Sequence, residues 1–204
     1  GTVSVTAIVR ADLERSGLFR TLELPPLVPQ PTESSSVNFA EWKARLADAL
    51  VVGSIAARPD GRFEVRFRLH DIVKAAQLGG LSVSMSAAQN RATGHKIADF
   101  IYEKLIGEPG AFSTRIAYVV KSGPRYELQV ADADGMNAQT ALSSREPIIS
   151  PSWSPDGTRL AYVSFENRRS EIYVQDLRSG SRKRISARPG VNGAPAWSPD
   201  GRQL

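Results

Sequence analysis

The 204-residue sequence contains no cysteine, two methionines and two histidines. Without cysteine, neither a disulfide framework nor a thiolate metal site can form. The two histidines, His70 and His95, show no H-x-x-x-H spacing and no supporting carboxylate cluster, so the sequence predicts no bound metal. No apolar run approaches the length of a membrane span, and membrane insertion is therefore not expected.

The short motifs of common enzyme families are also missing. None of the serines lies in a G-x-S-x-G motif, so the sequence has no nucleophile elbow. Gly79-Gly80 and the glycines at 107 and 110 do not form a phosphate-cradling loop behind a strand. No residue of this sequence therefore demands an enzymatic explanation, and we predict neither a catalytic residue nor a bound cofactor.

Lysine and arginine outnumber the acidic residues 26 to 21, which gives a net charge of +5. The positive residues are scattered, apart from two tight groups at Arg168-Arg169 and at 182–184. No aromatic residues that could stack on bases alternate with these groups, so we interpret them as solvated loops or edge strands. A nucleic-acid partner is therefore not predicted.

The most informative stretch is Trp153-Ser154-Pro155-Asp156-Gly157, which returns 44 residues later at 197–201. Serine, proline and glycine in this order favour a type I turn, because proline presets φ at its second position. The turn also accounts for Asp156 and Asp200, which need no acid–base role. Apolar alternation follows the first copy at 160–165, 171–175 and 183–186, and a period of about 40–45 residues is typical of propeller blades.

A third, partial copy lies upstream, since residues 114–119 stand 44 positions before residues 158–163. Tryptophans 153 and 197 are expected to fill the seams between neighbouring blades, and tyrosines 118, 162 and 173 are expected to pack there too. The sequence therefore predicts that residues 113–204 are the first blades of an incomplete β-propeller.

Residues before position 108 have a different pattern, in which helical and strand periods alternate. Helices are predicted over 2–16, from Asn38 to Ala47 and over 88–106, with Gly17 and Gly107 closing the first and the last. The apolar run at 49–55 predicts a buried strand, and 63–70 predicts its half-solvated hairpin partner. We interpret Gly79-Gly80 as a break before a third strand at 81–85, and 22–24 as a brief strand.

These elements predict an N-terminal α/β domain over residues 1–107, trimmed at its start, and a linker over 108–112. The expected fold class is thus a two-domain α+β and all-β protein, in which a propeller follows the α/β domain. Since closed propellers have about four to eight blades, the sequence is expected to be a fragment of a longer protein.

The order of these motifs resembles the TolB family of the Tol-Pal system. The resemblance rests on G-A-F-S-T-R-I-A-Y-V at 110–119, S-P-S-W-S-P-D-G-T-R-L-A-Y-V at 150–163 and N-G-A-P-A-W-S-P-D-G at 192–201. It implies a six-bladed, WD40-like propeller in a monomeric, non-enzymatic periplasmic protein whose signal peptide has been removed. Such a protein binds the peptidoglycan-associated lipoprotein Pal and TolA, is exploited by colicins, and acts in outer-membrane integrity and in envelope constriction at cell division.

The resemblance also implies where the partner binds. In this family the loops that enter each blade line the mouth that receives Pal, which makes Ile149, Asn192, Gly193 and Ala194 the candidate contacts. Gly193 would permit a close backbone approach, and Asn192 could exchange hydrogen bonds with the partner. Many relatives have histidine where this chain has Val191.

Two other classes of function remain open from the sequence. A peptidase of the prolyl oligopeptidase type also carries a propeller, but it requires a hydrolase domain with a nucleophile elbow. A carbohydrate-binding propeller would require an aromatic platform, and none is evident.

Overall fold

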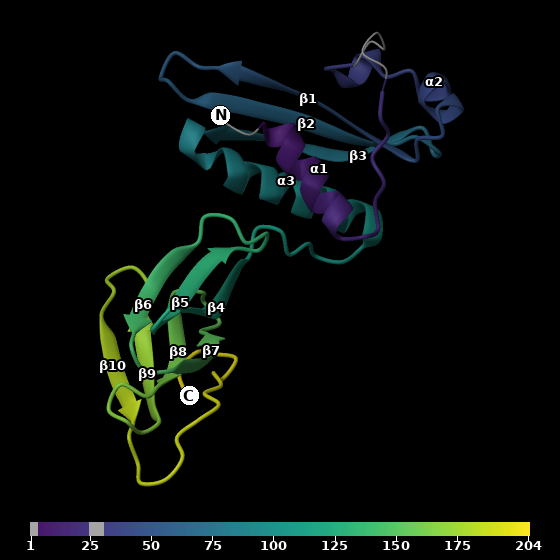
Figure 1. Ribbon diagram of the computed structural model, residues 1–204. Helices are drawn as coiled ribbons and strands as arrows, with labels where there is room; N and C mark the ends of the chain where they lie inside the picture. The colour runs from purple at the N-terminus through teal and green to yellow at the C-terminus, as the bar shows by residue number, and fades with distance from the viewer. Residues whose placement is uncertain (1–3, 25–30) are drawn as a thin grey trace. The chain divides into compact units, whose positions relative to one another are not determined.

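The computed structural model describes residues 4–24 and 31–204, and it divides into two compact units, 1–113 and 114–204 (Figure 1). The first residues of the predicted N-terminal helix, Thr2 and Val3, lie outside the described residues. Among the helices that are described, none has the length and apolar character needed to cross a membrane.

The first unit is a three-stranded antiparallel sheet with two long helices on one face (Figure 1). The sheet order is β1-β2-β3, and helices α1 and α3 contact each other. The elements are α1 (Val5–Arg15), η1 (Ser34–Ser36), α2 (Phe39–Ala44), β1 (Ala49–Ala57), β2 (Phe63–Asp71), β3 (Ala76–Met85), η2 (Ala87–Gln89) and α3 (Asn90–Ile106).

The helix ends follow local capping chemistry. The Ser4 hydroxyl accepts a hydrogen bond from the Ala7 amide at 3.1 Å, and Gly107 ends α3 with φ of 90°. The Asn38 side chain accepts from the Glu41 amide at 3.3 Å, as expected for an N-cap. Helix α2 nevertheless ends at Ala44 rather than at Ala47, because Leu46 takes a left-handed φ of 62°.

Three strand predictions in this unit were wrong in detail. Gly79-Gly80 does not break β3 but lies within it, and a Cβ on Gly80 would stand 2.1 Å from the Phe67 carbonyl oxygen. The apolar run at 49–55 lies on an edge strand, so Val51 is 41% exposed. Residues 22–24 form no strand; Leu22 and Leu24 belong to irregular chain that packs against the cluster of Trp42, Ala47 and Ile72.

The core of the first unit follows the alternation of β2. Val65, Phe67 and Leu69 face α3, where they meet Ile97 and Ile101. The register between β2 and β3 shifts between Leu69 and the next residue, His70, and both side chains are buried. Beyond α3, residues 108–112, predicted as a linker, end on the aromatic Phe112, which packs against Tyr102 of that helix.

The second unit consists of two adjacent β-sheets, followed by the second copy of the W-S-P-D-G turn at 197–201. The first sheet has the order β4-β5-β6 and the second β10-β9-β8-β7. The strands are β4 (Arg115–Ser122), β5 (Arg125–Asp132), β6 (Gln139–Ser144), β7 (Ile148–Trp153), β8 (Arg159–Ser164), β9 (Glu171–Asp176) and β10 (Arg182–Ser186). The four-stranded sheet is the whole blade that the repeat predicted.

Both copies of the repeated turn have the same hydrogen bonds. The Gly157 amide donates to the Ser154 carbonyl at 2.8 Å, and the Gly201 amide donates to the Ser198 carbonyl at 2.9 Å. In the first copy the Ser154 hydroxyl donates to the Asp156 carboxylate at 2.6 Å, and this bond, with those from Thr158, lowers the pKa of Asp156 to about 2. The aspartates are therefore turn residues, as predicted.

An arginine from each blade packs over the tryptophan ring of the next repeat. The Arg115 guanidinium lies 4.9 Å from the ring centroid of Trp153 and donates to the Gly157 carbonyl at 2.6 Å. Forty-four residues later, Arg159 lies 4.6 Å from Trp197 and donates to the Gly201 carbonyl at 3.2 Å. The tryptophans thus lie at the seams between repeats, as predicted, and the arginines hold them there.

We expect Arg115→Ala to destabilise the second unit by about 1–2 kcal/mol, because it removes a cation–π contact and a charged hydrogen bond together. The free energy of urea unfolding, followed by tryptophan fluorescence, measures this loss. Arg125→Ala is the matched control, since the side chain of that exposed arginine makes one hydrogen bond within the described residues, to the Ser143 hydroxyl at 3.2 Å. Equal stability losses in the two variants would contradict a stabilising role of the contact between Arg115 and Trp153.

Candidate partner-binding face

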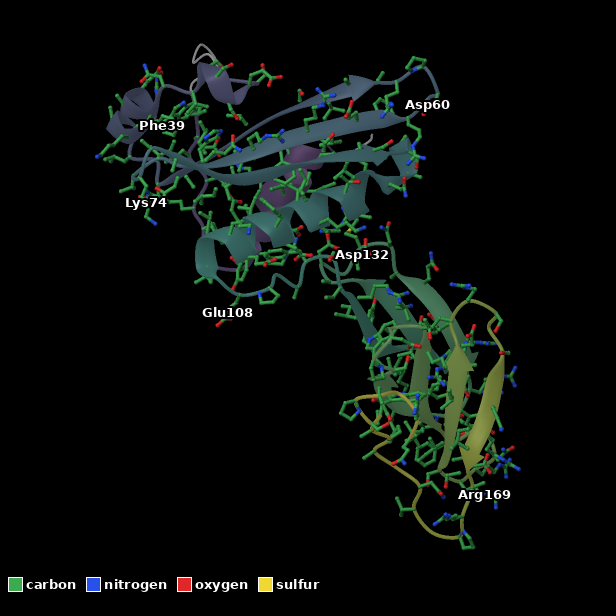
Figure 2. The ribbon with its side chains drawn as sticks, turned by 180° about the vertical axis from the view of Figure 1, so that it is seen from behind. Phe39, Asp60, Lys74, Glu108, Asp132 and Arg169 are labelled. Carbon is green, nitrogen blue, oxygen red and sulfur yellow. The ribbon has the colours of Figure 1, made fainter. Side chains whose placement is uncertain are left out.

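The strand register of the second blade brings three segments together at one end of the sheet. Ile148 pairs with Ser164, Ser164 pairs with Glu171, and Ser186 pairs with Ile172. We call this end the loop face, and it consists of residues 148–150, 165–171 and 184–194. Figure 2 shows the labelled Arg169 at this end of the second unit, opposite to Asp132. The repeated W-S-P-D-G turn lies at the other end.

The Asn192 side chain, which is only 6% exposed, links two segments of the loop face by hydrogen bonds. Its side-chain NH₂ group donates to the carbonyls of Ser170 at 3.1 Å and Arg188 at 2.8 Å. Its oxygen accepts from the Ser186 hydroxyl at 2.6 Å and from the Arg188 amide at 3.1 Å. The amide group has no donor left for a partner, so Asn192 positions the segment rather than offering it a hydrogen bond.

The backbone next to Asn192 is strained in a way that repeats between blades. Ala194 takes a left-handed φ of 52°, and Ser150, the equivalent residue 44 positions earlier, takes 53°. A left-handed conformation costs a non-glycine residue about 1–2 kcal/mol. Such strain persists where the surrounding structure imposes it, and it is concentrated at functional sites.

The residues around the two strained positions are exposed. Ile149 is 45% exposed and Val191 is 94% exposed. A Cβ on Gly193 would meet only Val191 Cγ1, at 3.9 Å, so packing within the chain does not require glycine there. The Trp197 indole donates to the Ser152 carbonyl at 3.2 Å, which holds the segment after Ala194 against β7. Ile149 and Ala194 therefore lie on neighbouring segments that leave an apolar surface open to solvent.

Farther out on the same face, Glu171 forms a buried ionic cluster. Its carboxylate is fully buried, with Oε2 accepting from Asn167 at 2.8 Å and from the Tyr173 hydroxyl at 3.0 Å. Oε1 accepts from Arg169 Nε at 2.9 Å and from Arg184 Nη1 at 3.3 Å. The hydrogen bonds from Asn167, Arg169 and Tyr173 lower the pKa of Glu171 to about 2, against the effect of burial.

We expect this carboxylate to make stability depend on pH. Because the folded pKa of Glu171 lies below its ordinary value of 4.5, the stabilisation is complete above that value and is lost as the pH falls toward about 2. The difference in unfolding free energy between the wild type and Glu171→Gln should therefore shrink between pH 5 and pH 2. Urea unfolding at several pH values measures it, with the exposed Glu146→Gln as the control that keeps the wild-type profile. A constant difference would contradict the assignment.

The histidines form no catalytic arrangement with the residues that the structure describes. The Ser34 hydroxyl lies 3.2 Å from His70 Nε2, but the buried His70 Nδ1 has no hydrogen-bond partner among the described residues, so no third group orients the imidazole as a base. His95 Nδ1 lies 2.6 Å from the Asp12 carboxylate, and both side chains are buried between α1 and α3. This geometry indicates a structural hydrogen bond between the two helices.

The candidates chosen from the sequence, Ile149, Asn192, Gly193 and Ala194, all lie on the loop face. The cluster around Glu171 was not predicted. Arg169 and Arg184 were interpreted as solvated loop and edge-strand residues, which holds only for their outer atoms. The missing signal was the register of β9 and β10, in which Arg184 pairs with Tyr173.

Comparisons with known proteins agree with this architecture. The chain matches the family model described as TolB amino-terminal domain over residues 2–78 and that of the TolB beta propeller domain over residues 102–204. The Tol-Pal system protein TolB of Aromatoleum aromaticum is 64% identical over 153 residues, covering 75% of this chain and 35% of that protein. That of Azoarcus sp. is 63% identical over 154 residues, covering 76% of this chain and 36% of that protein.

A solved structure extends the match to the whole chain. The crystal structure of TolB from Acinetobacter baumannii superposes with a TM-score of 0.88 and 42% identity, covering 97% of this chain and 50% of that one. The chain spans about a third of the length of the curated relatives it matches. The similarity therefore covers both units described here.

Proposed function

Because this chain belongs to the TolB family, we propose that it is part of a non-enzymatic scaffold that binds Pal through the loop face. The observation that carries the proposal is the left-handed backbone that recurs at one repeat position, at Ser150 and at Ala194, where the neighbouring Asn192 fixes the segment. A strained segment held rigid before binding loses little conformational entropy when a partner docks. Ile149, Gly193 and Ala194 are the proposed contacts, and Asn192 positions the segment that carries Gly193 and Ala194.

The proposed cellular role follows from the family. The protein acts in the periplasm, in outer-membrane integrity and in envelope constriction at cell division, and colicins use the same propeller face. TolA is the second proposed partner, and its contact lies in the segment that precedes α1. Residues 1–3, at the start of this chain, lie outside the described residues.

Isothermal titration calorimetry of the protein with the soluble domain of Pal tests the proposal. We expect saturable one-to-one binding, with the affinity carried by a few buried anchors rather than by total area. Absence of binding heat at high micromolar Pal, with the protein shown to be folded by circular dichroism, would refute the Pal assignment. Turnover of peptide p-nitroanilide substrates would favour the peptidase alternative instead.

A further inference from the structure

The arginines around Glu171 exceed what this buried carboxylate needs. Asn167, Tyr173 and Arg169 already donate three hydrogen bonds at 3.0 Å or less, and Arg184 adds a fourth at 3.3 Å. Two guanidinium groups therefore converge on one carboxylate oxygen, which leaves one positive charge in excess. Glu166, the nearest acidic residue along the chain, does not balance this excess positive charge, because it pairs with Arg182 at 2.7 Å.

The outer atoms of both arginines face solvent. The side chain of Arg169 is 59% exposed and that of Arg184 is 50% exposed. Arg169 uses only its Nε on Glu171, and Arg184 uses only one terminal nitrogen. Each guanidinium carries five N–H donors in a planar fork, so most of their donors remain available in the described structure. Figure 2 shows blue nitrogen ends gathered beside the labelled Arg169.

The pair is also held in place before any ligand arrives. The fully buried Glu171 orients both guanidinium groups, and its low pKa keeps it charged at neutral pH. Two like charges held side by side repel each other, and an added anion relieves that repulsion. Planar carboxylates match the fork of arginine with two parallel hydrogen bonds.

We propose that Arg169 and Arg184 form a clamp that binds an acidic side chain of the protein partner docked on the loop face. The clamp is continuous with that face, because the backbone amide of Asn192 donates to the hydroxyl of Ser170 at 2.9 Å, and Ser170 is the residue next to Arg169. The segment that carries Arg184 also exposes the apolar side chains of Ile185, at 48%, and Val191, at 94%. Arginine beside an apolar surface is typical of protein–protein contacts. The inference rests on the proposed function only for the position of the partner.

The edge of the neighbouring blade argues against a purely protective role for these charges. Positive residues on an edge strand commonly prevent sheet-to-sheet aggregation. Strand β6 is also an edge strand, yet its sequence Gln139–Ser144 contains no charged residue. Protection of an edge therefore does not by itself require the arginines of β10, and it does not explain Arg169, which lies in a loop.

A fluorescein-labelled hexaglutamate peptide tests the clamp without Pal, by fluorescence anisotropy at low salt. We expect Arg169→Gln/Arg184→Gln to weaken its affinity by about tenfold or more, since two charged hydrogen-bonding groups are lost. Arg178→Gln/Lys183→Gln removes the same charge from the same blade and should change the affinity less than about twofold. Arg169→Lys/Arg184→Lys keeps the charge but lacks the planar fork, and it should still weaken binding by about threefold.

Glu171→Gln separates an oriented clamp from diffuse attraction. It adds one positive charge, so diffuse attraction predicts tighter hexaglutamate binding, whereas loss of orientation predicts weaker binding. Equal losses in the two glutamine double variants, or tighter binding by Glu171→Gln, would overturn the proposal. So would clamp-dependent binding to phosphatidylglycerol vesicles without any binding of hexaglutamate. If Pal fails to bind in calorimetry while hexaglutamate binds through the arginines, the clamp stands and only the identity of its partner changes.

Discussion

Replacing Ala194 with tryptophan is expected to weaken the affinity for Pal by about a hundredfold, while the protein remains folded. Ala194 is exposed on the strained segment, beside the surface around Ile149 that we propose as the contact. A large side chain at this point would stand between the two proteins and keep the neighbouring backbone from close contact. Isothermal titration calorimetry with the soluble domain of Pal measures the loss, and circular dichroism confirms the fold.

Ala194→Gly is the matched control at the same position. Glycine adopts a φ near 52° without steric cost and leaves the surface as small as alanine does. Its affinity for Pal should stay within about threefold of the wild type, because only a methyl group is removed. A folded tryptophan variant that binds Pal as tightly as the wild type would remove Ala194 from the proposed contact.

Leu160→Ala is expected to lower the unfolding free energy of the second unit by about 3 kcal/mol, within the range for buried leucine. Leu160 is fully buried on β8, in a cluster with Leu128, Ile148 and Tyr162. The truncation leaves a cavity that the surrounding strands cannot fill, because they are held by pairing on both sides of β8. Urea unfolding followed by tryptophan fluorescence gives the measurement.

The repeat supplies the control for this prediction. Ile116 stands 44 residues before Leu160, at the equivalent position, but it is 40% exposed. The reason is that β4 is the edge of its sheet, whereas β8 lies between β7 and β9. Ile116→Ala should therefore cost about 1 kcal/mol or less. Similar losses for the two variants would show that burial at Leu160 is not what stabilises this blade.

The loop face was only partly predictable from the sequence. Ile149, Gly193 and Ala194 were chosen through the resemblance to the family, and their role as contacts stays a prediction. The role of Asn192 was not predictable, since one of its four side-chain hydrogen bonds goes to Ser170, on another segment of the loop face. The pairing of Glu171 with Arg184 likewise depends on a strand register that no local pattern specifies.

By itself, the sequence determined whatever depends on neighbours along the chain. The turns at 154–157 and 198–201, the cap at Ser4 and the glycine that ends α3 follow from the preferences of a few adjacent residues. Tertiary structure alone decided that Leu160 is buried while the equivalent Ile116 is exposed, and that Gly79-Gly80 continues β3. It also decided that Arg169 and Arg184 share one carboxylate. These outcomes depend on strand order and on segments distant in sequence, whose contacts carry no local signature.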